Sequence, residues 1–218
     1  MNDSQRPEQP TLESQPSRSR RRFLGAGAAI PPTLLTLGSQ PALGVTCFTP
    51  SRSLSRNTSV SQQGKNGECV GAQSPGNYMA QQDSTKNAYF WPASVAPSTK
   101  FHPLFSGSRY KVSGVSLSLG QVLKLTPSTS PADPGRVAFH LIGAYLNVKG
   151  GSGASIPSHV ITDSVIKGIW TEWDTKGYYE PMAGVRWYAD YTQVGASVTV
   201  AAPNGGIIGY LKSNGIVA

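Results

Sequence analysis

Apolar residues are sparse over residues 45–100 and become frequent, at helical spacing, from Phe101 onward. The first of these stretches is rich in Ser, Asn, Gln, Gly and Pro. In the second, apolar residues recur every three or four positions, which places them on one face of a helix that a compact domain buries. The pattern therefore predicts an irregular segment over residues 45–100 and a compact, mainly helical region over residues 101–218.

The clearest helix begins at Asp133, because Asp caps free N–H groups and the proline after it suits the first helical position. Its apolar spacing continues until Gly150 ends it. A second helix is predicted over residues 162–174. There Trp170 and Trp173 share one arc with aliphatic side chains, so we expect both indoles in the core. Shorter helical segments are predicted at residues 79–86 and 117–125.

The last forty residues predict a third helix and a small hairpin. Residues 181–189 begin with proline and carry apolar residues on one face, with Trp187 on the opposite side. Farther on, an Asn-Gly pair separates two apolar runs, residues 196–202 and 207–211. Because Asn-Gly favours the turns that join paired strands, these runs predict a hairpin near the C-terminus.

The first 44 residues combine a polar leader, a cationic block and an uncharged, weakly apolar stretch, which is the plan of an export signal. The leader, residues 1–17, has no apolar periodicity and should be disordered. The stretch after the block contains two adjacent prolines and four glycines, so it is too interrupted for a membrane-spanning helix. The block itself carries paired arginines and a following Phe-Leu, as twin-arginine signals do. Its defining residues are Ser19, Arg20, Arg21, Phe23 and Leu24.

Small residues before Val45 predict cleavage after Gly44, with a second candidate after Gly38. A nucleic-acid-binding arm is the other interpretation of the arginines, but they stop abruptly before an uncharged stretch that phosphate binding does not need. We therefore expect a periplasmic or secreted protein. Its partners in transit are the twin-arginine export machinery and a signal peptidase, and its mature chain has no transmembrane span.

The charge of the chain changes little on cleavage. Its 218 residues include 19 Lys and Arg and 11 Asp and Glu, a formal net charge of +8. Residues 1–44 hold five arginines and three acids, so 14 − 8 leaves +6 on the mature chain. The remaining cations are scattered singly, which argues against a nucleic-acid site and permits only weak attraction to anionic cell-wall polymers.

Two cysteines, Cys47 and Cys69, lie in the polar segment that begins the mature chain. In an oxidising compartment they predict one disulfide, which staples a segment too polar to be held by burial. A metal pair is the alternative, but a tetrahedral site needs about four ligands and no CxxC or HxxxH spacing occurs. No metal and no cofactor are expected.

Several short motifs follow one another along the mature chain. They are Cys47-Phe48-Thr49-Pro50-Ser51, Cys69 with Ser74-Pro75-Gly76, Phe101-His102-Pro103-Leu104-Phe105, Ala144-Tyr145-Leu146-Asn147, Gly168-Ile169-Trp170, Tyr179-Glu180-Pro181-x-Ala183-Gly184-Val185-Arg186-Trp187-Tyr188-Ala189 and Tyr210-Leu211-Lys212-Ser213. With these motifs the chain resembles a group of exported bacterial proteins of unknown function. That group shares a twin-arginine signal, paired cysteines, a Ser-Pro-Gly-Tyr-Trp-Lys-Asn-His-like motif and a C-terminal Gly-Val-Lys/Arg-Trp-Tyr helix. This chain departs from the third motif with Asn77-Tyr78-Met79, and residues 192–206 look inserted. The resemblance implies export and a fold, and no activity.

The chain offers little that indicates catalysis. It lacks a G-x-S-x-G elbow, a P-loop and a dinucleotide fingerprint, and its three histidines have no ligand spacing. We expect His140 to pack in a helix. His102, in a loop, is the least explained of the three. An envelope hydrolase or metal-dependent enzyme that uses His102 with nearby carboxylates is the alternative function, and the candidate acids are Glu172, Asp174 and Glu180.

Seven of the thirteen Trp and Tyr residues fall within residues 170–191. Trp170, Trp173 and Tyr188 share faces with aliphatic residues and are predicted to lie in the core. The other four, Tyr178, Tyr179, Trp187 and Tyr191, are predicted to form a semi-exposed platform for stacking on sugars or on a partner protein. The sequence thus favours a non-catalytic binding or structural module of the cell envelope, whose ligand is a cell-wall polymer or an envelope protein.

Overall fold

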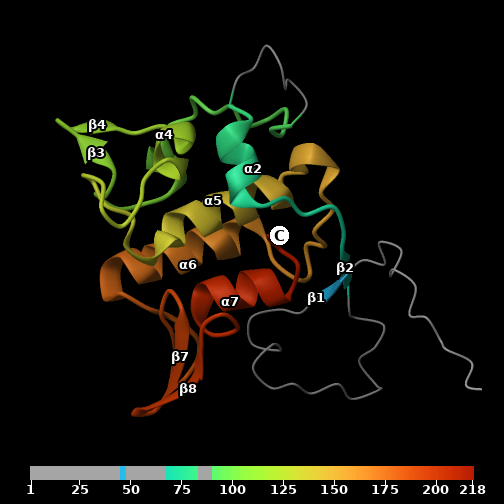
Figure 1. Ribbon diagram of the computed structural model, residues 1–218, viewed down its shortest axis with the longest axis vertical. Helices are drawn as coiled ribbons and strands as arrows, with labels where there is room; N and C mark the ends of the chain where they lie inside the picture. Colours follow the sequence, from blue (N-terminus) through green and yellow to red (C-terminus); the bar gives the residue numbers. More distant parts are fainter. Residues whose placement is uncertain (1–44, 48–66, 83–89) are drawn as a thin grey trace, which may run out of the picture. The chain divides into compact units, whose positions relative to one another are not determined.

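Two helices, α5 (Val137–Val148) and α6 (Asp163–Lys176), form the centre of the computed structural model, which describes residues 45–47, 67–82 and 90–218 (Figure 1). The predicted leader, export signal and cleavage site lie outside the described residues. The elements around the two central helices are β1 (Val45–Cys47), β2 (Gly67–Cys69), α2 (Pro75–Ala80), α3 (Phe101–Leu104), β3 (Lys111–Val112), β4 (Val115–Ser116), α4 (Leu119–Leu123), the 3-10 turns Pro134–Arg136 and Gly151–Gly153, β5 (Tyr179–Met182), β6 (Val185–Trp187), β7 (Tyr191–Val194), β8 (Ser197–Ala201) and α7 (Gly206–Ser213).

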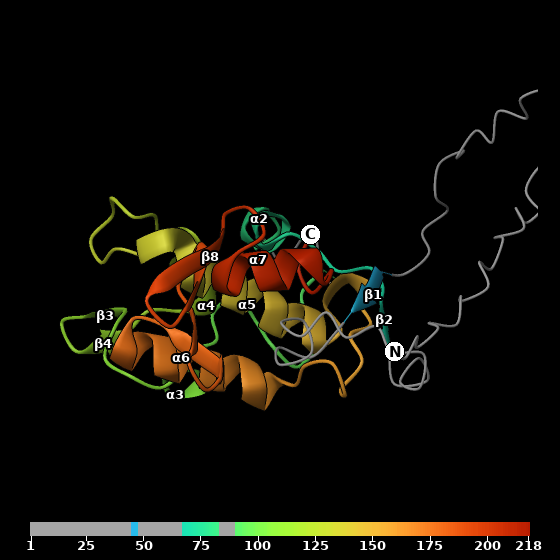
Figure 2. The ribbon, with the colours of Figure 1, turned by 90° about the horizontal axis from the view of Figure 1, so that it is seen from below.

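Helix α5 is buried over almost its whole length, from Val137 to Asn147. A helix that is apolar all round needs cover on every side. Helices α2, α4, α6 and α7 provide that cover, and Figure 2 shows α7 lying alongside α5. Gly143 of α5 lets α2 approach closely, because a side chain at this position would collide with Pro75.

Both strongly predicted helices are present, but the first begins later than predicted, because α5 starts at Val137 after a 3-10 turn at Pro134–Arg136 in which Arg136 is left-handed. Thr162 caps the first turn of α6 with its hydroxyl, and Gly177 ends the helix in a left-handed conformation. Asp133 precedes α5, and its carboxylate accepts hydrogen bonds from the N–H groups of Ala138 and Phe139 at 3.1 and 3.0 Å. The segment 117–125 contains α4, as expected. Helix α2 begins earlier than the helix predicted at 79–86, whose second half lies outside the described residues.

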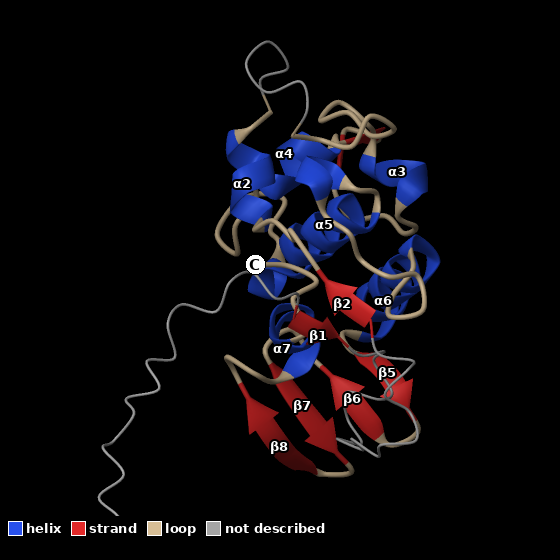
Figure 3. Ribbon diagram, turned by 90° about the vertical axis from the view of Figure 1, so that its right-hand side faces the viewer, coloured by secondary structure: helices blue, strands red, loops and turns tan. Residues whose placement is uncertain are grey.

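The expectation of a mainly helical fold is wrong. The C-terminal part contains a four-stranded antiparallel sheet in the order β5-β6-β7-β8, which Figure 3 shows beside α7. The third helix predicted over residues 181–189 is instead the β5–β6 hairpin, whose turn contains Gly184 with φ of 77°. The predicted hairpin is wrong as well, because residues 197–201 pair with β7 and residues 206–213 form α7.

The predicted disulfide is confirmed. Cys47 and Cys69 are bonded and buried, at the ends of the short antiparallel pair β1–β2.

The chain that follows is fixed to α5 by Asn147, whose side chain is completely buried. Its Oδ1 accepts from the Tyr78 hydroxyl at 2.7 Å, and its Nδ2 donates to the carbonyl of Ile216 at 2.8 Å. One amide therefore joins α2, α5 and the end of the chain.

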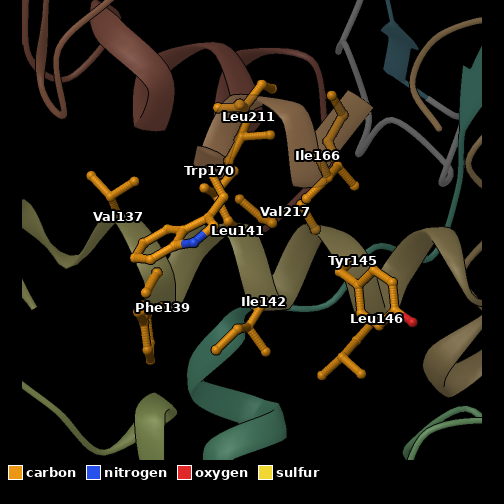
Figure 4. Packing of buried hydrophobic residues seen from close by; sticks show 14 of the residues in the cluster. Val137, Phe139, Leu141, Ile142, Tyr145, Leu146, Ile166, Trp170, Leu211 and Val217 are labelled. Atoms are coloured by element: carbon orange, nitrogen blue, oxygen red, sulfur yellow. The ribbon is translucent and has the colours of Figure 1, made fainter. Parts of the chain in front are cut away.

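Trp170 and Trp173 lie in the core as predicted, with 0% and 6% of their surfaces exposed. Figure 4 shows the Trp170 indole reaching from α6 to α5 beside Leu141. Its Nε1 donates to the carbonyl of Ser106 at 2.7 Å, so the polar edge of the ring is satisfied. Three further buried rings, Phe101, Phe105 and Tyr110, lie within 6.3 Å of it, centroid to centroid.

Candidate binding surface

The strand register sorts the side chains of the four-stranded sheet onto two faces. Trp187 pairs with Thr192, and both are buried, so this row faces the core. The adjacent row consists of Arg186, Gln193 and Val198, which pair across β6, β7 and β8. Since successive residues of a strand point to opposite faces, this second row lies on the other side of the sheet. Arg186 and Val198 are exposed there, which makes it the open face.

A β-bulge in β8 brings additional side chains to the open face. Val200 pairs with Thr192 and Val198 pairs with Gln193, so Thr199 is the extra residue of the bulged strand. As a result Ala201, which pairs with Tyr191, lies on the same face as Val198 although it is three residues away. Here the surface forms a shallow, open groove of about 430 Å³. The groove is lined by Asp190, Tyr191, Gln193, Val198, Ala201 and Ala202.

Three half-buried tyrosines, Tyr178, Tyr188 and Tyr191, form a row that leads to this groove. We call them the tyrosine row. The rings of Tyr188 and Tyr191 are stacked, with centroids 4.3 Å apart and planes at 10°. The Tyr178 ring lies 5.8 Å from Tyr188, and the Arg186 guanidinium lies over Tyr178 at 4.8 Å. Tyr191 therefore borders the groove, and the Tyr188 ring stacks against the Tyr191 ring.

The predicted platform is divided between the two faces of the sheet. Tyr178 and Tyr191 belong to the tyrosine row, whereas Tyr179 lies 6.0 Å from Trp187 on the core side. The expectation that Trp187 is exposed is wrong, because only 2% of its surface is accessible and its ring packs on Tyr210 at 4.9 Å. Helical spacing placed Trp187 opposite its apolar neighbours, whereas the strand places it with them. Tyr188, expected in the core, stacks on the open face instead.

Opposite charges flank the tyrosine row and the groove. Arg186 is exposed beside Gln193, and Asp190 is exposed at the groove itself. Neither forms an ion pair with another described residue. Partial burial, with the neighbouring Tyr188 and Asp190, raises the pKa of the Tyr191 phenol, which keeps its hydroxyl protonated and able to donate a hydrogen bond. Arg186, Asp190 and Gln193 were not predicted as site residues, because the pairing of β6 with β7 and the groove beside it are not visible in the sequence.

The residues of the alternative enzyme site are bonded to other partners. His102 Nε2 lies 2.6 Å from the backbone carbonyl of Arg109, and the Arg109 guanidinium pairs with Asp174. Glu172 pairs with Lys176 at 2.9 Å, and Glu180 accepts from the N–H of Gly184 at 2.8 Å. Within the described ranges, no three His, Cys, Asp or Glu side chains gather closely enough to hold a metal ion. The geometry therefore does not join His102 to a carboxylate.

His140 is buried in α5, as expected. Its Nδ1 has no partner among the described residues. Burial, reinforced by the positive charges of Lys212 and Arg136, lowers the pKa of His140 to about 4. The ring is therefore neutral at physiological pH. His159 is exposed.

The chain matches no family model, no curated protein and no solved structure. None of the helices in the described part of the chain is long and apolar enough to cross a membrane.

Proposed function

We propose that this chain is an exported, non-catalytic binding module that holds a component of the cell envelope on the open face of its four-stranded sheet. The observation that carries the proposal is the stacked pair Tyr188–Tyr191 at the edge of the groove. A ring held in place by a second ring offers a preorganised flat apolar surface with a polar end. Grooves that combine such surfaces with a few polar groups are the usual sites of small-ligand binding.

Three features support export. Residues 1–44 have the composition of a twin-arginine signal, and the chain resembles a group of exported bacterial proteins. The disulfide between Cys47 and Cys69 is of a kind that persists in oxidising compartments. The proposed partners in transit are the twin-arginine machinery and a signal peptidase, and the proposed destination is the periplasm or the exterior.

Export is tested by changing both Arg20→Lys and Arg21→Lys, which preserves the charge and removes the paired arginines. The double variant should remain in the cytoplasm, with the thiols of Cys47 and Cys69 reduced. Arg18→Lys, outside the pair, is the matched control and should be exported and oxidised. Normal export of the double variant would show that the twin-arginine interpretation is wrong.

Binding is tested by incubating purified protein, residues 45–218, with insoluble cell-wall material and measuring the fraction that sediments. Tyr191→Ala should reduce the bound fraction at least fivefold, because it removes the ring at the groove. Val115→Ala, which truncates an exposed residue of the β3–β4 hairpin, should bind like the unchanged protein. Equal sedimentation of all three proteins would remove the tyrosine row as the binding surface.

A further inference from the structure

We infer that the open face binds an uncharged, polyhydroxylated glycan, an inference that rests on the proposed function. The shape of the groove suits part of a longer chain. The groove is open and shallow, and its volume of about 430 Å³ lies within the range of about 300–1,000 Å³ typical of small-ligand sites. An open groove at a sheet surface admits one or two units of a longer chain whose remaining units extend into solvent.

The groove combines an aromatic ring with polar side chains. One side of a pyranose ring presents a flat set of C–H groups that fits an aromatic ring, and Tyr191 offers such a ring at the groove. Two polar side chains, Asp190 and Gln193, line the groove with it, and Arg186 lies on the same face with its guanidinium over Tyr178. Arg186 only donates, Asp190 only accepts, and Gln193 does both. Hydroxyl groups both donate and accept hydrogen bonds, so a polyhydroxylated ligand suits all three side chains. A purely apolar ligand would remove water from these side chains without giving them hydrogen-bond partners.

The charges at the open face are balanced. There the cation Arg186 is accompanied by the anion Asp190, and Lys176 at the end of α6, 5.9 Å from the Tyr178 ring, is paired with Glu172. Residues 191–211, which supply β7, β8 and most of α7, contain no charged residue at all. A polyanion would gain no net attraction at this face. Its attraction to residues 45–218 as a whole, with a net charge of 14 − 8 = +6, would be diffuse and screened by salt.

The test compares uncharged and anionic probes by isothermal titration calorimetry on protein comprising residues 45–218. The uncharged probes are tetramers of N-acetylglucosamine, glucose and mannose, and the anionic probe is polygalacturonate, each at 0.05 and 0.5 M NaCl. At least one uncharged tetramer should bind with a Kd that changes less than twofold between the two salt concentrations. Polygalacturonate should bind only at low salt.

The variants identify the site. Tyr191→Ala should weaken the uncharged tetramer at least tenfold and Asp190→Asn about fivefold, while Val115→Ala leaves the Kd unchanged. Far-ultraviolet circular dichroism of each variant shows that it is folded, and Asp190→Asn provides a second variant should Tyr191→Ala unfold.

The failures of the two proposals are distinguishable. If cell-wall material binds through Tyr191 but none of the three tetramers does, the ligand class is wrong and the proposed function stands. The cell-wall material also contains envelope proteins, and treating it with protease tests whether one of these is the partner. If that treatment abolishes binding, the partner is an envelope protein and the glycan inference is overturned. If neither cell-wall material nor any tetramer binds, both proposals fall.

Discussion

Trp187 and Tyr188 are adjacent in the sequence and serve opposite sides of the four-stranded sheet. The Trp187 indole packs against Tyr210 in the core, whereas the Tyr188 ring stacks on Tyr191 at the open face. The change of side follows because the alternation of side chains along β6 continues one residue past its end, where the Tyr188 N–H bonds to the Tyr191 carbonyl. Because of it, a single strand contributes both to the stability of the domain and to its candidate site.

Truncation should separate these two roles. Trp187→Ala should cost about 3–5 kcal/mol of folding free energy, because it leaves a large cavity between the sheet and α7. Tyr191→Ala should cost less than about 1 kcal/mol, since a half-buried ring loses few core contacts. Urea unfolding followed by circular dichroism measures both. If the two variants lose equal stability, the tyrosine row is part of the core and not a surface.

Trp187→Phe is the matched control for the cavity. The Nε1 of Trp187 is buried and has no hydrogen-bond partner among the described residues. Phenylalanine preserves an aromatic ring and removes this N–H group. Trp187→Phe should therefore lose much less free energy of unfolding than Trp187→Ala. A loss as large as that of alanine would contradict this and would show that the core needs the full volume of the indole rather than one aromatic ring.

Asn147 should be among the most sensitive polar positions in the chain. Its side chain bonds both the N–H and the carbonyl of Gln73, at 3.0 Å each, in addition to Tyr78 and Ile216. Asn147→Ala leaves these groups without their partner in a buried site, and we expect a loss of about 2–4 kcal/mol in urea unfolding. Asn77→Ala, whose side chain makes an exposed bond to Gln73, is the control and should change stability by less than about 0.5 kcal/mol. Equal losses would contradict the role of Asn147.

The buried His140 should make stability depend on pH in mildly acidic solution. Its pKa is about 4 in the folded chain and 6.5 in its ordinary state, so between these values the unfolded chain binds a proton that the folded chain does not. Stability from this group is therefore lost as pH falls from about 6.5 to about 4, by about 3 kcal/mol in total. Burial raises the pKa of Asp133, so at the acid end of this range the folded chain holds a proton that the unfolded chain releases. This group therefore adds stability as the pH falls, opposite to His140.

A variant isolates the histidine from that opposing group. His140→Gln should flatten the dependence of unfolding free energy on pH between 7 and 4 relative to the unchanged chain. His159→Gln replaces an exposed histidine and should leave the dependence as it was. If His140→Gln and the unchanged chain lose stability in parallel over this range, the ring is not held neutral by burial.

The helices and the disulfide could be predicted because their signals are local. Asp133, Thr162 and Gly177 mark helix ends through contacts within a few residues of themselves. Cys47 and Cys69 are the only cysteines, so their pairing required no knowledge of the fold. These features depend on short-range chemistry that the sequence displays directly.

The sheet and its open face could not be predicted because they depend on register. Strands β5 to β8 are three to five residues long, too short for a period of two to be told from a helical period. The bulge at Thr199 then breaks the alternation in β8, and Gly205 passes so close to Val200 that only a residue without a side chain fits. Arg186 and Gln193 meet only because β6 pairs with β7.

The central claim, that the open face of the sheet binds an envelope component, is tested most directly by nuclear magnetic resonance. Backbone amide signals of residues 45–218 are recorded during titration with soluble fragments released from cell-wall material. The account predicts saturable shifts at Asp190, Tyr191, Gln193 and Ala201, with Trp187 and Tyr210 on the core side unchanged or shifted far less. Saturable shifts confined to another surface, such as that around His102, would contradict it.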